Sequence, residues 1–78
     1  MTLTKIVVSR LLIFMNEQNS TQYKLAQKIG VPFPTIKSIM QQKTKNISLR
    51  TIILLSRGLG IKASEFLGDA SFDEVELL

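Results

Sequence analysis

The sequence predicts an all-α domain, and two observations support that class. Turn-forming and polar residues divide the chain into pieces of helical length, at Asn19, Gly30, residues 42–47 and Gly60. Within the pieces, apolar residues repeat with the period of a helix, and the alternation that marks a strand does not appear. Because 78 residues make one domain, we expect a compact five-helix fold.

The first helix is predicted over residues 4–18. Its apolar residues recur at i, i+4, i+7 and i+8 and therefore share one face, which comprises Val7, Leu11, Phe14 and Met15. Ile13 projects from the outer face of the same helix, with Leu12 at its edge. This pair is either an ordinary scatter of exposed apolar residues or a surface that a partner covers, and both interpretations stay open.

A glycine separates the second helix from the third. Thr21 is a suitable N-cap for a helix over residues 22–29. The inner stripe of this helix is Leu25, Ala26 and Ile29. Gly30 ends the helix at the position where a left-handed backbone is needed.

A proline fixes where the third helix begins. Since proline is tolerated only in the first turn of a helix, this helix should begin at Phe33 or Pro34 and extend to about residue 41. Ile36 and Ile39 are then its inner residues. The polar and basic stretch at residues 42–47 indicates a loop.

Two further helices complete the predicted domain. Ser48 caps a helix over residues 49–58, whose inward residues are Ile52, Ile53, Leu55 and Leu59. A short helix over residues 63–67 places Phe66 and Leu67 on the core.

Charge divides the chain into a cationic body and an anionic end. Residues 1–62 hold ten basic side chains and one acid, Glu17, an excess of nine positive charges. The other five acids lie within residues 65–78, so the formal net charge is only +4. We interpret residues 1–68 as a domain and residues 69–78 as a loose acidic and apolar tail. A cationic body attracts polyanions such as nucleic acid, and a solvated basic surface gives the same charge count.

The side chains that catalysis and metal binding use are scarce in this sequence. It contains no cysteine and no histidine, so disulfides, a thiolate zinc site and the usual general base are excluded. We therefore expect no enzymatic activity, no metal and no cofactor. The apolar run at residues 6–15 is interrupted by Ser9 and Arg10, and it is shorter than the roughly 20 residues of a membrane span. These features favour a soluble, cytoplasmic protein that does not associate with membranes.

Residues 21–43 combine two short helices with a tight turn. Two helices that cross through such a turn need a small residue where they approach, a residue free to adopt positive φ, and an apolar lock. Ala26 supplies the small residue and Gly30 the turn, and the lock consists of Leu25, Ile36 and Ile39. The outer face of the second helix in the pair is then free to enter a major groove.

The order of these residues resembles a known family. The pattern Thr21-Gln22-x-x-Leu25-Ala26-x-x-Ile29-Gly30-Val31-x-x-x-Thr35-Ile36-x-x-Ile39 is similar to the helix-turn-helix of the lambda-repressor/Cro-like family, also called the xenobiotic-response-element family. The similarity continues downstream and covers about residues 10–67. It implies a lambda-repressor-like five-helix domain that binds double-stranded DNA in a sequence-specific manner, as a transcriptional regulator of repressor type.

The resemblance also implies roles for individual residues. The recognition helix would span about residues 33–41, and its base-reading positions would be Phe33, Pro34, Lys37, Ser38 and Gln41. The positions that contact phosphate would be Thr21, Gln22, Thr35, Lys43, Lys45 and Asn46. Two departures from the family pattern stand out. Phe33 and Pro34 donate no hydrogen bond to a base edge, and Gln42 stands where the family commonly has glycine.

Two observations indicate protein partners: the family resemblance, and apolar residues that the predicted core does not use. The family's operators are usually paired half-sites, which implies a homodimer. The candidate dimer or partner residues are Leu12, Ile13, Val75, Leu77 and Leu78. An alternative is the antitoxin or immunity component of a two-protein module, whose tail binds a protein partner.

Overall fold

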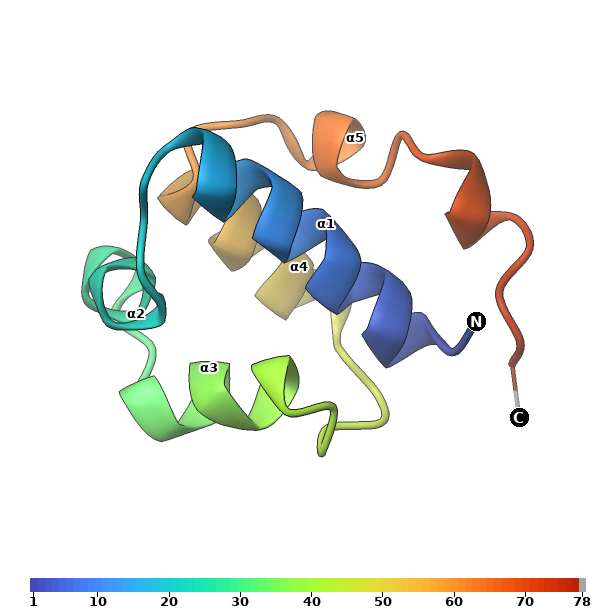
Figure 1. Ribbon diagram of the computed structural model, residues 1–78, viewed down its shortest axis with the longest axis horizontal. Helices are drawn as coiled ribbons and strands as arrows, with labels where there is room; N and C mark the ends of the chain where they lie inside the picture. Colours follow the sequence, from blue (N-terminus) through green and yellow to red (C-terminus); the bar gives the residue numbers. More distant parts are fainter. Residues whose placement is uncertain (78) are drawn as a thin grey trace.

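A computed structural model describes residues 1–77 of the chain, which form five α-helices and one 3-10 turn (Figure 1). The elements in chain order are α1 (Leu3–Glu17), α2 (Gln22–Ile29), α3 (Phe33–Met40), α4 (Leu49–Gly58), α5 (Ala63–Phe66) and the 3-10 turn η1 (Ala70–Phe72). Every predicted helix boundary lies within one residue of the observed one. The all-α, five-helix class is therefore confirmed.

Helix α1 runs through the centre of the molecule, with α3 on one side and α5 on the other (Figure 1). The four residues predicted to face inward on α1 are buried, as are Ile6 and Val8. The remaining buried apolar residues come from every other α-helix and from the residue after α4, namely Leu25, Ala26, Ile36, Ile39, Ile52, Leu55, Leu59 and Phe66. Because α1 is covered on two sides, its buried face is wider than a single helical stripe.

Gly58 allows α2 and α4 to pack in direct contact. A β-carbon at this position would lie 2.4 Å from Cγ2 of Ile29 and 2.7 Å from Cδ1 of Leu25. Real β-carbons essentially never lie this close to another atom, so any side chain at Gly58 would force the Ile29 and Leu25 side chains of α2 to shift. The sequence assigned the small-residue role to Ala26 alone, and Gly58 is a second close approach that it did not reveal.

The predicted loose tail is the main correction to the sequence analysis. Residues 70–72 form the turn η1, and the Phe72 ring packs 6.4 Å from the ring of buried Phe66. Further on, Thr2 and Glu76 form a parallel bridge, and the Glu76 N–H donates to the Met1 carbonyl at 3.1 Å. The tail is therefore attached to the body at both ends of its described part, and the N-terminal residues lie beside Glu76 (Figure 1).

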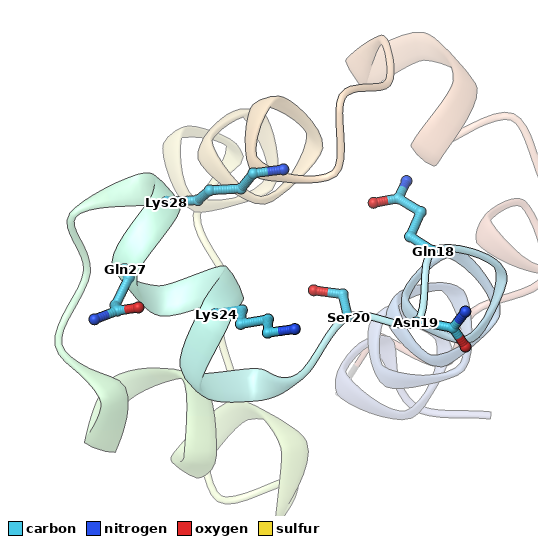
Figure 2. A pocket seen from close by; sticks show the side chains of 6 residues that line it. All are labelled: Gln18, Asn19, Ser20, Lys24, Gln27 and Lys28. Carbon is cyan, nitrogen blue, oxygen red and sulfur yellow. The ribbon is translucent and has the colours of Figure 1, made fainter.

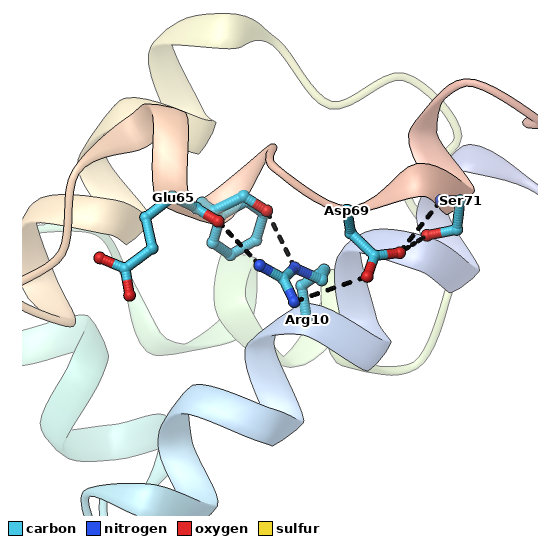
Figure 3. A network of polar contacts seen from close by, with 5 residues as sticks. Arg10, Glu65, Asp69 and Ser71 are labelled. Atoms are coloured by element: carbon cyan, nitrogen blue, oxygen red, sulfur yellow. Dashed lines mark hydrogen bonds and ion pairs between the residues drawn. The ribbon is translucent and has the colours of Figure 1, made fainter.

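Arg10 links α1 to α5 and to the start of the tail (Figure 3). Its guanidinium donates to the Phe66 carbonyl at 2.9 Å and to the Glu65 carbonyl at 2.7 Å, and it lies 3.9 Å from a carboxylate oxygen of Asp69. The side-chain and backbone hydrogen bonds from Ser71, together with the Arg10 charge, hold the pKa of Asp69 below its ordinary value. One of the ten basic residues is thus engaged within the fold.

Leu67 is a smaller correction. It was expected on the core beside Phe66, but it is exposed, whereas Phe66 is fully buried. The physical reason is that α5 ends at Phe66, so Leu67 is a capping residue and does not continue the buried face. Within residues 1–77, no helix combines the length and the apolar character that crossing a bilayer needs.

Candidate nucleic-acid interface

The helix-turn-helix has the geometry that the sequence predicted. The Thr21 hydroxyl caps α2 by accepting from the Lys24 N–H at 3.1 Å. Gly30 adopts φ 68°, and its N–H donates to the Ala26 carbonyl, so the chain turns sharply into α3. The lock residues Leu25, Ile36 and Ile39 are all buried between the two helices and the rest of the core.

The candidate recognition helix α3 lies at one edge of the molecule (Figure 1). The residue before it, Pro32, makes no side-chain capping bond, and Pro34 follows in the first turn. Five of the six residues predicted on this helix and at its end to contact DNA are exposed: Phe33, Pro34, Thr35, Lys37 and Gln41. Phe33, Lys37 and Gln41 follow one another at intervals of four, so they form one row along α3.

Ser38 is the sixth residue, and its position differs from that of the others. It is half-buried, and its hydroxyl lies 3.2 Å from the Thr44 hydroxyl in the following loop. This hydrogen bond directs the Ser38 side chain toward the loop.

An aromatic pair that the sequence analysis missed lies at the N-terminal ends of α2 and α3. The Tyr23 and Phe33 rings pack edge to face, with centroids 5.9 Å apart, and both remain exposed, at 56% and 37%. The sequence does hold one indication of this pair, because an aromatic residue falls in the first turn of each helix of the motif. The pair presents apolar surface and a phenolic hydroxyl beside the leading end of α3.

Helix α3 ends just before Gln42, the residue that stands where the resembling family commonly has glycine. Gln42 adopts φ 60°, the left-handed conformation that glycine favours. Its N–H donates to Ile39 and the Lys43 N–H donates to Ser38, each at 2.9 Å, which is the hydrogen-bond pattern of a Schellman motif. The helix therefore ends as it would with glycine, with a non-glycine residue under strain.

The segment that follows, residues 43–46, is hereafter called the phosphate loop, after the phosphate contacts that the sequence predicts for it. Lys43, Lys45 and Asn46 are exposed, whereas Thr44 between them is half-buried. The Thr4 hydroxyl on α1 donates to the Thr44 carbonyl at 2.5 Å. The loop thus lies against the start of α1 with its cationic side chains outward.

The predicted anchors at the start of α2 differ in exposure. Thr21 is exposed and Gln22 is half-buried. Because the Thr21 hydroxyl already caps its own helix, Gln22 is the freer side chain of the two. Both lie at a helix N-terminus, where unpaired N–H groups and the helix dipole attract a phosphate.

A polar groove of about 510 Å³ lies between the end of α1 and α2 (Figure 2). Its lining consists of Gln18, Asn19, Ser20, Lys24, Gln27 and Lys28. None of these residues comes from α3 or from the phosphate loop. The two lysines of α2 therefore add positive charge on the first helix of the motif without belonging to the predicted contact set.

The predicted dimer or partner residues differ in exposure. Leu12 and Ile13 are exposed on α1, as expected. In the tail, Leu77 is exposed at 79% and Val75 is half-buried, while Leu78 lies outside the described residues.

Comparison with known proteins identifies a family. A family model described as a helix-turn-helix, of the lambda-repressor/Cro-like type, matches residues 11–66, which is more than half of the chain. No curated protein and no solved structure matches the chain.

Proposed function

Because the chain belongs to the lambda-repressor/Cro-like helix-turn-helix family, whose members are DNA-binding regulators, we propose that it binds double-stranded DNA sequence-specifically as a repressor-type transcriptional regulator. In this proposal it is a cytoplasmic protein without catalytic activity. One observation carries the proposal: the exposed row on α3 directly precedes an exposed cationic loop. This is the order of a segment that reads bases followed by a segment that binds the backbone.

We place α3 in the major groove, with Lys37 as its principal reader. Lysine donates to guanine O6 and N7, and Gln41, one turn further along, is a second donor of hydrogen bonds. Phe33 and Pro34 offer only apolar contact, which suits thymine methyl groups. With so few polar readers, DNA shape and deformability contribute the rest of the specificity.

The phosphate loop and the helix ends supply most of the affinity in this scheme. Lys43 and Lys45 neutralise phosphates, and Asn46 donates to one. Gln22 and Thr35, near the N-termini of α2 and α3, add hydrogen bonds and a favourable helix dipole. These contacts fix the register of α3 on the duplex without reading its sequence.

Selection of bound sequences from a pool of random duplexes tests the proposed function. We expect enrichment of a short motif repeated as an inverted pair, because a two-fold dimer reads palindromic half-sites. Recovery of the unselected pool, with no enrichment after repeated rounds, would contradict sequence-specific binding.

The proposed regulator is a homodimer. Leu12 and Ile13 provide an exposed apolar surface on α1, and Leu77 provides another in the tail. Sedimentation equilibrium of the wild type, Ile13→Glu and a chain truncated after residue 76 separates the two surfaces, since only the true interface should dissociate. If the wild type stays monomeric at all concentrations, the free protein forms no stable dimer, and two copies would pair only when both are bound to DNA.

The exposure of the same apolar residues favours a second candidate function, the antitoxin or immunity component of a two-protein module. In that case Leu77 and the α1 pair would contact a different protein. Purification from native lysate should then yield a partner in a 1:1 ratio, and Ile13→Glu or the truncation should release it. Purification of the chain alone favours the regulator.

A further inference from the structure

Thr4 has a buried hydroxyl whose hydrogen bonds all leave its own helix. Among residues 1–77, only Thr4 and Ser56 are polar residues classed as buried, at 5% and 1% exposure. Ser56 donates to the Ile52 carbonyl one turn earlier in α4, so its hydroxyl is satisfied locally. Thr4 instead donates to the Thr44 carbonyl at 2.5 Å and lies 3.4 Å from the Lys45 carbonyl, across about 40 residues of sequence.

A second hydroxyl holds the same loop residue from the other side. Ser38 on α3 shares a hydrogen bond of 3.2 Å with the Thr44 hydroxyl. Thr44 is thus contacted at its carbonyl by α1 and at its side chain by α3. Within the described residues, the Lys43 N–H bond to the Ser38 carbonyl is the one backbone hydrogen bond that residues 43–46 donate, so the two hydroxyl contacts to Thr44 add the remaining hydrogen bonds that hold the loop.

The direction of the neighbouring side chains follows from that arrangement. With Thr44 drawn inward, Lys43 and Lys45 on either side of it are exposed. Their cationic groups would otherwise sample many directions, and ordering them at the moment of binding carries an entropic cost. A loop already held in place binds phosphates with less of that cost.

We propose that Thr4 and Ser38 are positioning residues for DNA binding, which clamp Thr44 and thereby orient the lysines of the phosphate loop. This inference rests on the proposed DNA-binding function. It gives Ser38 a role different from the base-reading one that the family resemblance implies. A base reader affects binding to particular sequences, whereas a clamp on a phosphate-binding loop affects all duplexes alike.

The test compares variants that differ by one hydroxyl. Thr4→Val removes the α1 hydroxyl at nearly constant shape, Ser38→Ala removes the α3 hydroxyl, and Thr4→Ser retains the donor. Ser9→Ala is the matched control, since the Ser9 hydroxyl donates to the Lys5 carbonyl within α1 and touches nothing in the loop. Affinity for a random duplex and for a selected duplex is measured across a salt series for each variant.

We expect Thr4→Val and Ser38→Ala each to weaken binding to both duplexes by the same factor, roughly three- to tenfold, with an unchanged slope of log K against log[salt], because the same phosphates are neutralised and only the cost of ordering the loop rises. Thr4→Ser and Ser9→Ala should bind like the wild type. Amide hydrogen exchange of the free protein should accelerate at residues 43–46 in the two clamp variants and stay unchanged in α4.

Three outcomes would overturn the clamp. The first is wild-type affinity in both hydroxyl-deleting variants. The second is a loss confined to the selected duplex in Ser38→Ala, which would make Ser38 a base reader. The third is uniform acceleration of hydrogen exchange across the whole chain in both variants, which would mark a general structural role. A wild type that binds no duplex at any salt concentration contradicts the proposed function instead.

Discussion

Helix α3 and the phosphate loop are adjacent in sequence, yet they are built in opposite ways. Helix α3 is fixed by apolar burial of Ile36 and Ile39, and its exposed side begins with the apolar Phe33. The phosphate loop is fixed by hydrogen bonds to Thr44, and its exposed side is cationic. The comparison teaches that two adjacent segments are held by different interactions, apolar burial in α3 and hydrogen bonds in the loop. Under the proposed function, the fixed orientation of α3 serves base reading, and the outward lysines of the held loop serve phosphate binding.

The largest effect is expected from removing the charge of the phosphate loop. The double variant Lys43→Ala/Lys45→Ala should lose affinity for every duplex by roughly 10- to 100-fold at 0.1 M salt, because two counterion-releasing contacts disappear. Electrophoretic mobility shift on selected and random duplexes measures the loss. Arg57→Ala/Lys62→Ala is the matched control for net charge, since both cations are exposed and lie outside the helix-turn-helix and the predicted contact set. An equal loss in the control would mean that overall charge, and not the loop, determines affinity.

On the side of α3, Lys37→Ala should relax the preference at one base pair of each half-site. The expected cost is on the order of 1–3 kcal/mol for the preferred base at that position, and random duplexes should be bound almost as before. Repeating the sequence selection with the variant shows which column of the motif loses information. If Lys37→Ala weakens binding to every sequence by the same factor, Lys37 contacts the DNA backbone. In that case phosphate binding extends from the loop into α3.

The junction between the two segments gives a smaller effect on stability. Gln42→Gly removes a side chain from a left-handed backbone, and we expect the free energy of unfolding to rise by about 0.5–1 kcal/mol. Urea denaturation followed by circular dichroism measures the change. Gln41→Gly is the control, because Gln41 has φ −85° and gains nothing from glycine. A decrease in stability at position 42 would mean that the Gln42 side chain makes a stabilising contact.

The smallest effect concerns the tail, which lies outside the comparison. The pKa of Asp69 is lowered in the folded protein, so its ionised form favours folding above its ordinary value of 3.8. That contribution is lost as the pH falls through the folded-state pKa. Stability measured downward from about pH 4 should therefore decline less steeply in Asp69→Asn than in the wild type. Identical slopes would show that the Ser71 hydrogen bonds and the Arg10 charge together give Asp69 no measurable effect on stability.

Features that local sequence encodes were predicted well. Helical periodicity, the caps Thr21 and Ser48, and the left-handed Gly30 each depend on neighbours within a few residues, so the helix boundaries followed from the sequence alone. The family pattern depends on the same local spacing. The exposed positions on α3 and in the phosphate loop are therefore predictable from the sequence.

Contacts between distant segments were not predictable in this way. The Arg10 contacts with α5 and Asp69, and the pairing of Thr2 with Glu76, join residues more than fifty positions apart. Nothing in their local patterns marks them as partners. Gly58 was read only as the end of a helix, because its role depends on how closely α2 approaches α4.

The salt dependence of wild-type binding tests the central claim most directly, because that claim assigns affinity to the cations of the phosphate loop. A plot of log K against log[salt] should fall with a slope of about −1.8 per subunit or steeper, with Lys43 and Lys45 each neutralising one phosphate. The slope should be nearly the same on a selected and on a random duplex, since phosphate contacts carry no sequence information. A flat plot on both duplexes would contradict the account.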